Sequence, residues 1–540
     1  MTPTARTAAA IFAGTLLAAA ANGSTAPLVD AAKTGDLARV QSLIESDPSA
    51  VDQAGSDGST ALHWAVNQDH LAMVEVLLDA GADAQVRNRY GFPAIALAAM
   101  NGNADVLTLL IHSGADPRAT VPGGESAAMT AARTGDPDAI RVLLAAGADP
   151  NLPNEAGQTA LMWAAAANNP DAITALVDGG ADLAAKTPKG LDALLFAARA
   201  GHRAATEALL DAGADIGSTM ATGESVLEAA LVNTHWDIAD LLLDRGADPN
   251  QADAGYTALH RVTVQRQIIR GVVPSEEAAI PIGSLDIIMD LIRKMIANAM
   301  DVDARMAKDR LKEQRFVNMR DVLFRVGATA FLLAAKEADL ELMELLLEAG
   351  ADPTIPTFDG TTPAMVAAGL YSDTGNYGRF VQRGWAGHVL EATEMCLDLG
   401  NDVNAINDVG DTALHGAAYR GALDVAQLLV RRGAKLDAVD TRGLTPLSVA
   451  TGVYYKMGIS QKPQIAKFLR SLMQVRGLPT EVLPPDMDTR CLYCYLTQYA
   501  QFEAAKEHAR ELEERFAAEQ ARKTVAANRF RPPERIRYRR

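Results

Sequence analysis

The sequence is poor in cysteine and in aromatic residues, and both shortages exclude classes of protein. Three cysteines in 540 residues are too few for a disulfide-stabilised framework. Aromatic residues make up 5% of the chain although 49% of it is hydrophobic, so its apolar surface is mainly aliphatic. This composition favours closely packed helices, because small side chains let neighbouring helices approach each other.

Positive charge is also in deficit, which argues against nucleic acid as a partner. The formal net charge is −17, and phosphate binding requires clustered Lys and Arg. The exception is the tail 523–540, where seven Lys or Arg stand against Glu534 alone. We expect this tail either to be solvated or to contact the acidic body of the protein, an acidic partner or anionic lipid. If the protein contacts a membrane, we expect the contact to be made by this tail alone.

Signatures of catalysis are missing. We find no Ser-His-Asp spacing, phosphate-binding glycine loop or paired carboxylates, and we therefore predict no catalytic residue, cofactor or metal site. The pair Cys491 and Cys494 has C-x-x-C spacing, but Tyr495 stands where haem attachment needs His, and only His508 lies near as a further zinc ligand. A local disulfide is the main prediction for this pair, with a redox or metal role and free thiols as alternatives. Cys396 falls among helical apolar residues and is predicted to be a buried core thiol.

Long apolar runs are missing too, apart from the beginning of the chain. Arg6 precedes the apolar stretch 8–21, which is short for a membrane span and is followed by small residues. We predict that residues 1–24 are a signal peptide and that the mature protein is periplasmic or secreted. The alternative is an Ala-rich helix that covers the end of the fold.

What the sequence does contain is a repeat. Glycines recur every 33 residues, at Gly58, Gly91, Gly124, Gly157, Gly190 and Gly223. Each begins a phrase such as Gly58-Ser-Thr-Ala-Leu-His-Trp-Ala, in which the Thr is a candidate helix N-cap. A Gly-Ala-Asp follows 23 residues after each glycine and closes a stretch with helical apolar spacing. Each unit is therefore predicted to be a turn, a short helix, a longer helix and a glycine stop.

These phrases resemble the ankyrin repeat, with its Thr-Pro-Leu-His-x-Ala-Ala signature and Gly-Ala-Asp ending. The resemblance implies an all-α solenoid of about twelve helix-turn-helix units over residues 25–475 with β-turn fingers, followed by a helical extension at 476–540. It also implies that His63, His260 and His415 bond the backbone of the turns. In the fourth unit Ala127-Ala-Met-Thr130 replaces the signature, so we expect a less regular helix there.

Four insertions interrupt the later units, near 266–282, 305–326, 371–387 and 452–460. Three of them fall between the two helices of alternate units, and we expect them to form one recognition surface or, alternatively, to cover the apolar flank of the stack. The insertion near 305–326 is charged and predicted to project as an arm. Residues typical of binding hot spots lie in two of the loops: Tyr377, Arg379, Phe380, Arg383, Trp385, Tyr454 and Tyr455.

Beyond the repeats, an amphipathic helix is predicted from about residue 499 to residue 523. Its apolar positions alternate in steps of three and four: Phe502, Ala505, Ala509, Leu512 and Phe516. The helix is short, so we expect it to pack on something, with the last repeat favoured over a second copy. The oligomeric state is left open.

The function predicted from these features is that of an extracytoplasmic scaffold that binds another protein. By the resemblance, the contacts would come from the inner helices and the finger tips, whose candidate residues are Arg89, Tyr90, Phe92, Glu155, Lys189, Glu224 and Tyr256. Two alternatives are a redox or metal-linked protein that carries Cys491 and Cys494 on the repeats, and an exported effector that binds a host protein. The family does not specify the partner.

Overall fold

The computed structural model describes most of the repeat region. The described residues are 26–271, 284–307, 326–370, 386–441, 443–455 and 458–481, together with Arg510, Glu511, Glu514 and Ala518. The predicted signal peptide 1–24 and the basic tail 523–540 lie outside them. The chain divides into two compact units, Met1–Thr222 and Gly223–Arg540.

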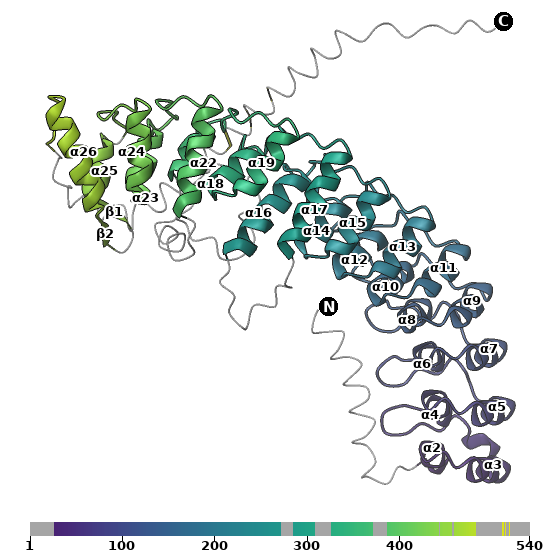
Figure 1. The fold of residues 1–540 in the computed structure, drawn as a ribbon. Helices are drawn as coiled ribbons and strands as arrows, with labels where there is room; N and C mark the ends of the chain where they lie inside the picture. Colours follow the sequence, from purple (N-terminus) through teal and green to yellow (C-terminus); the bar gives the residue numbers. More distant parts are fainter. Residues whose placement is uncertain are drawn as a thin grey trace, which may run out of the picture. The chain divides into compact units, whose positions relative to one another are not determined.

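Both units are built from pairs of antiparallel helices, of which we term the first the inner and the second the outer helix. The inner helices of the first unit are α2 (Pro27–Lys33), α4 (Ala61–Asn67), α6 (Ala94–Asn101), α8 (Ala127–Thr134), α10 (Ala160–Ala167) and α12 (Ala193–Ala200). The outer helices are α3 (Leu37–Ser46), α5 (Leu71–Asp79), α7 (Ala104–His112), α9 (Pro137–Ala145), α11 (Pro170–Asp178) and α13 (Arg203–Asp211), and a 3₁₀ turn, η2 (Pro48–Ala50), follows α3. Inner helices pack in one row and outer helices in another, as α2 to α7 show most plainly (Figure 1).

The second unit repeats this arrangement. Its inner helices are α14 (Val226–Val232), α16 (Ala258–Gly271), α18 (Ala330–Lys336), α20 (Pro363–Ala368), α23 (Ala413–Arg420) and α25 (Pro446–Gly452). Its outer helices are α15 (Trp236–Asp244), α17 (Ser284–Ala297), α19 (Leu340–Glu348), α22 (Ala386–Asp398), α24 (Leu423–Arg431) and α26 (Pro463–Val475). The described residues thus form twelve pairs, six in each unit, which confirms the predicted repeat number and helical fold class.

The local sequence explains where the helices begin and end. Thr60 is the N-cap of α4 and forms a capping box with His63, which satisfies backbone donors that the first helical turn leaves unpaired. After α5 the chain turns at Gly81, whose φ of 90° lies in the left-handed region that favours glycine. The predicted order of short helix, longer helix and glycine stop is confirmed in this pair.

The prediction of a less regular fourth unit is wrong. Helix α8 is as long as α6 and α10, and Ser126 acts as its N-cap by accepting a hydrogen bond from the backbone N–H of Met129 at 3.2 Å. Ala127, Ala128 and Met129 are fully buried. A serine hydroxyl caps a helix as well as a threonine does, so the loss of the signature leaves the helix intact.

The hydrophobic core is a ladder of side chains that extends through each unit. Its rungs recur at the repeat length on the outer helices of the first unit: Leu77, Leu110, Leu143, Leu176 and Leu209, all with no exposed surface. Small alanines on the inner helices fill the space between neighbouring pairs. Stability is therefore expected to accumulate from contacts between adjacent pairs and not from a single centre.

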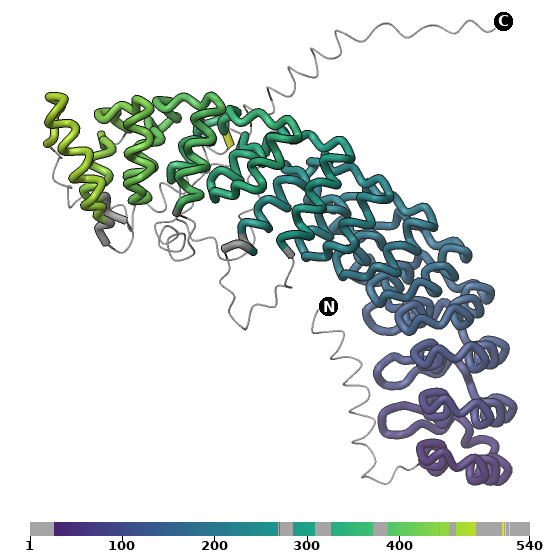
Figure 2. The backbone as a smooth tube through the Cα atoms, viewed as in Figure 1, coloured from purple at the N-terminus to yellow at the C-terminus, as the bar shows by residue number. Residues whose placement is uncertain are grey.

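Between pairs, the backbone projects as β-turn fingers with a glycine near each tip. The backbone of Gly190 has a φ of 78°, and an added Cβ would lie 2.4 Å from the amide nitrogen of Ala221 in the next finger. Glycine is therefore required there both for the left-handed turn and for the close approach of neighbouring fingers. The tube trace shows these fingers beside α4 and α6 (Figure 2).

Parts of the predicted insertions belong to regular structure. Residues 266–271 continue helix α16, where Arg266 is 3% exposed and bonds Asp339 at 2.8 Å. Met306, which falls in the insertion near 305–326 that was predicted to project as an arm, is fully buried, and its N–H donates to the carbonyl of Ala328 at 3.0 Å. For residues 266–271 and Met306 the assignment to the insertions is thus wrong, because long-range partners draw these residues into the fold, whereas 272–283 and 308–325 lie outside the described residues.

The last insertion contains the one named pair of strands among the described residues. Strand β1 (Val453–Tyr455) pairs antiparallel with β2 (Gly458–Ser460), with Tyr454 opposite Ile459. Its β-branched and aromatic residues favour extended structure, which the helical repeat pattern concealed. Within the described part of the chain, no helix combines the length and apolar character needed to cross a bilayer.

Candidate protein-binding surfaces

The finger tips of the first unit carry four of the predicted contact residues at the surface. Arg89 and Glu155 each donate a backbone N–H to the preceding finger, at 2.9 and 3.1 Å, and the carbonyl of Lys189 accepts from the next finger at 3.0 Å. Their side chains are exposed, and that of Tyr90 is 49% exposed. Phe92 is half-buried at the base of its finger. The hydrogen bonds between tips hold these side chains along one edge.

The histidines of the repeat phrase have the structural role that the resemblance implies. The Nδ1 atom of His63 accepts the backbone N–H of Thr60 at 3.2 Å, so the proton resides on Nε2, which donates to the carbonyl of Phe92 at 3.1 Å. His260 and His415 make the same two kinds of contact. Burial lowers the pKa of His260 to about 4, which keeps the ring neutral. These rings join adjacent repeats and are not placed for acid–base chemistry.

The inner-helix face of the first unit holds two tryptophans, each covered by a cation. The ammonium of Lys33 lies 5.0 Å from the ring centre of Trp64, and the guanidinium of Arg133 lies 5.2 Å from that of Trp163. In both pairs the cation comes from the end of one inner helix and the indole from the next. The separation falls within the range in which a cation is attracted to an aromatic face.

Neither cation is in an ion pair with a described carboxylate. Glu125 is close enough to Arg133 to feel its charge, which opposes the burial that raises the pKa of Glu125. Trp64 is 7% exposed, whereas Trp163 and Phe196 are half-buried. We term the surface formed by these two cation–tryptophan pairs and Phe196 the inner face.

The sequence predicted contacts through the inner helices but not the residues of the inner face, although the repeat contains the signal for them. Trp64 and Trp163 occupy the same place in their phrases, six residues after the glycines Gly58 and Gly157. Alignment of the units on these glycines would have placed both indoles in one row. The cation over each ring is apparent only once adjacent repeats are stacked.

In the second unit, the prediction of an exposed Tyr256 is wrong. Tyr256 is 2% exposed, and its hydroxyl accepts a short hydrogen bond from Arg261 and donates to Glu224 at 3.3 Å. The guanidinium of Arg261 also lies 4.7 Å from the Tyr256 ring centre. Arg261 comes from the following inner helix and draws the ring into the fold, whereas the sequence position suggested a finger tip. Glu224 is half-buried beside this cluster.

Beside this cluster lies a buried glutamate. Glu228 is 1% exposed, and its Oε2 accepts the backbone N–H of Ser225 at 3.0 Å in a capping box. Its Oε1 is buried without a hydrogen-bond partner among the described residues. Burial, the largest effect, raises the pKa of Glu228 to about 8, which the Ser225 hydrogen bond and the charge of Arg261 oppose. Glu228 is therefore expected to be largely neutral near physiological pH.

Most of the remaining predicted site residues lie outside the part of the chain that the structure describes. Tyr454 and Tyr455 belong to strand β1, while the other loop and cysteine candidates lie outside the described residues: Tyr377, Arg379, Phe380, Arg383, Trp385, Cys491 and Cys494. Cys396 is fully buried, as predicted, and burial raises the pKa of its thiol to about 12. Across the described residues there is no grouping of His, Cys, Asp and Glu that could hold a metal ion.

The repeated helix pairs, fingers and bridging histidines correspond to known family models. A model of ankyrin repeats in three copies matches residues 28–121, 119–187 and 180–253, a single-repeat model matches 326–358, and a model of many copies matches 397–450. Together these ranges cover more than half of the chain. The chain belongs to the ankyrin-repeat family. Ankyrin repeats generally bind other proteins.

Individual relatives match this chain over short stretches. The human neurogenic locus notch homolog protein 1 is 33% identical over 145 residues, which is 23% of this chain and 6% of that protein. The bovine ankyrin repeat and SOCS box protein 3 is 30% identical over 23% of this chain and 21% of its own length. The human Notch-regulated ankyrin repeat-containing protein is 34% identical over 81 residues, 14% of this chain and 71% of that protein. This ankyrin-repeat chain therefore spans small fractions of the first two relatives.

Proposed function

We propose that this ankyrin-repeat protein is a non-catalytic scaffold that works outside the cytoplasm and binds a partner protein across the inner face and the exposed finger tips. The observation that carries the proposal is the inner face, where two of the four tryptophans of the chain lie under cations. Tryptophan and arginine are the residue types that contribute most to binding hot spots. The fold supports protein binding in general, and the residues of the inner face support the proposed location of the binding surface.

The chemistry of the inner face selects a partner segment with both acidic and apolar side chains. Lys33 and Arg133 are fixed over indole rings and have no described carboxylate within ion-pair distance. A carboxylate of the partner would complete the contact of either cation, and the half-buried rings of Trp163 and Phe196 would accept an apolar side chain. Along the fingers, Tyr90 and Arg89 extend the surface.

The test is to isolate a partner with the full chain from an extracytoplasmic extract and to measure its affinity for matched variants. We expect Arg133→Ala and Trp163→Ala each to weaken binding at least tenfold, because truncation at a hot spot costs about 2 kcal/mol or more. Arg141→Ala is the control, because Arg141 is an exposed cation on the outer helix of the same repeat. Equal affinities for Arg133→Ala, Trp163→Ala and the unmodified protein would refute binding at the inner face.

The location is tested separately. We expect the mature protein to begin between residues 21 and 25 and to be recovered from the extracytoplasmic fraction, which mass spectrometry of its N-terminus would establish. An intact N-terminus in the cytoplasmic fraction would refute the location and leave binding at the inner face standing.

A further inference from the structure

The two cations of the inner face, Lys33 and Arg133, are held apart by a row of packed helices. Lys33 belongs to α2 and Arg133 to α8, and α2, α4, α6 and α8 pack against one another in succession. Packed helices lie about 8–10 Å apart, so three steps separate the two cations by about 24–30 Å. The stack of repeats therefore sets the distance between these positive charges.

The following repeat holds the backbone of each cation in place. The side-chain amide of Gln68 donates to the carbonyl of Lys33 at 2.8 Å, and that of Asn169 donates to the carbonyl of Arg133 at 2.9 Å. A tryptophan ring lies beside the charged end of each cation. Groups that are already in position lose less freedom when a partner binds. Both cations are thus prepared to receive a partner at their present separation.

The two helices between the cations carry no charge. Neither α4 nor α6 contains Lys, Arg, Asp or Glu. The repeats between Trp64 and Trp163 have Leu97 and Thr130 at the tryptophan position, and these are 2% and 6% exposed. A charged partner side chain against α4 or α6 would lose its water and gain no counter-charge from these helices. The surface therefore favours a partner whose acidic residues stand at the two ends of an uncharged stretch.

A helix suits this surface better than an extended segment. The backbone groups of the inner helices are hydrogen-bonded within each helix, so an extended backbone laid across them would lose water without gaining partners. A helical partner brings its own backbone hydrogen bonds. Eighteen residues of helix rise about 27 Å and complete five turns, which returns the chain to the same face. Two carboxylates at this spacing match the separation of Lys33 and Arg133.

We propose that the partner of the inner face is an amphipathic helix with two acidic residues about eighteen positions apart. One carboxylate pairs with Lys33, the other pairs with Arg133, and the apolar stretch between them lies across α4 and α6. The inference rests on the proposed binding at the inner face and adds the spacing that the partner must have. Once one end is bound, the second contact is intramolecular, which favours a partner that reaches both cations.

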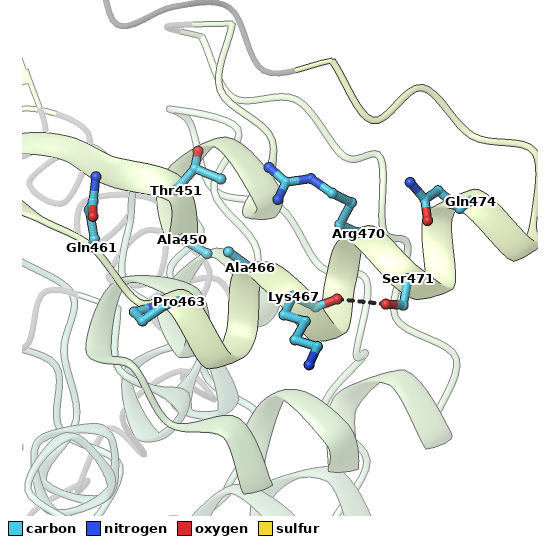
Figure 3. A pocket seen from close by; sticks show the side chains of 9 residues that line it. All are labelled: Ala450, Thr451, Gln461, Pro463, Ala466, Lys467, Arg470, Ser471 and Gln474. Carbon is cyan, nitrogen blue, oxygen red and sulfur yellow. Dashed lines mark hydrogen bonds between the residues drawn. The ribbon is translucent and has the colours of Figure 1, made fainter.

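A second pair of cations in the chain provides a comparison. Lys467 and Arg470 line an open hollow of about 300 Å³ between α25 and α26, and they extend to opposite sides of Ala450 and Ala466 (Figure 3). They are three residues apart on one helix, which is about 4.5 Å of helix rise. These cations can attract an acidic peptide, but they are too close together to favour carboxylates eighteen residues apart.

The experiment measures the affinity of the full chain for two designed helical peptides by titration calorimetry. Each peptide has a leucine stripe and two glutamates on one face, eighteen residues apart in the first peptide and eleven in the second. Eleven residues also return to that face but rise only about 17 Å. We expect the first peptide to bind at least tenfold more tightly. Lys33→Ala and Arg133→Ala should each remove this difference, whereas Lys467→Ala/Arg470→Ala should leave it unchanged.

Charge reversal tests the pairing of each end. Lys33→Glu should abolish the preference for the first peptide, and replacing one of the two glutamates of that peptide by lysine should restore tight binding to this variant. Arg39→Glu is the matched control, because Arg39 is an exposed cation on α3, the outer helix of the same repeat. The preference should be unchanged in this control.

The proposal is overturned if the two peptides bind with equal affinity, if neither binds, or if Lys33→Glu retains the preference. The isolated partner separates this failure from failure of the proposed function. If its affinity falls in Arg133→Ala and Trp163→Ala while the two peptides bind alike, the inner face stands as the binding surface and only the spacing is refuted. Unchanged affinity of the partner for those two variants would refute the inner face itself.

Discussion

The buried carboxyl of Glu228 makes the stability of the second unit depend on pH in an unusual direction. Glu228 occupies the position at which His63, His260 and His415 donate a hydrogen bond to the next repeat, five residues after the finger glycine. A carboxylate has no proton to donate there, and one of its oxygens is buried without a described partner. Protonation removes the cost of burying this charge.

The pKa values of Glu228 in the folded and unfolded states decide whether the free energy of unfolding rises or falls with pH. In the folded protein the pKa of Glu228 is raised from 4.5 to about 8, so the folded state retains a proton that the unfolded chain releases. The retained proton stabilises the folded state fully below about pH 4.5, and this stabilisation is lost as the pH rises through 8. Each pH unit in this window changes the free energy of unfolding by about 1.4 kcal/mol, which gives about 3 kcal/mol between pH 5 and pH 7.5. Arg261 opposes this shift, whereas Glu224 and Asp253 add to it.

The substitution Glu228→Gln tests this account, because glutamine accepts the Ser225 N–H and cannot ionise. We expect the variant and the unmodified protein to be similarly stable at pH 5, and the variant to be more stable by about 3 kcal/mol at pH 7.5. The assay is hydrogen exchange of the α14 and α15 amides, corrected for intrinsic rates. Glu75→Gln, an exposed position on α5, controls for the loss of one charge. Parallel pH dependences in the Gln variant and the unmodified protein would refute the reasoning.

Three further predictions concern single contacts. Gly190→Ala should destabilise the first unit by about 1–3 kcal/mol in denaturant unfolding, because the added Cβ would collide with the next finger. Gly180→Ala is the control and should cost less, because a Cβ added there has no neighbour within 4 Å. Arg266→Met should cost about 3–5 kcal/mol, because it leaves the 2% exposed carboxylate of Asp339 without its guanidinium, and adding Asp339→Asn should recover part of the loss. In a variant with the other two cysteines replaced by serine, Cys396 should resist Ellman's reagent at pH 8 until denaturant is added, and rapid labelling of the native protein would contradict its burial.

The repeat pattern predicted the fold well because each of its signals acts locally. A glycine with positive φ after a helix, a threonine or serine cap and a run of leucines at helical spacing determine structure within about ten residues of themselves. The exposed tips Arg89 and Lys189 follow from the same pattern, because they stand beside finger glycines. The binding surfaces were harder to predict, because their residues are distant in sequence. Arg133, for example, is separated from Trp163 by nearly one repeat of sequence.

Two of the wrong predictions concern side chains that are buried through contacts with charged groups. Tyr256 was placed at a finger tip because it stands beside a finger glycine, and residues 266–271 were placed in a loop because the spacing of ordinary repeats changes there. In the structure, Tyr256 contacts Arg261 and Glu224, which lies 32 residues away, and Arg266 contacts Asp339 across 73 residues of sequence. Charged side chains with distant partners leave no periodic trace in a single sequence.

The sequence by itself determined the repeat length, the number of units, the order of helices and the positions of the turns, because those depend on backbone conformations that nearby residues impose. Only the tertiary structure decided which polar groups are buried, as Glu228 and Tyr256 show, and which side chains meet across neighbouring repeats, as Lys33 and Trp64 do. The physical reason is that burial and pairing are properties of stacked repeats. They arise when one helix pair removes water from the face of the next.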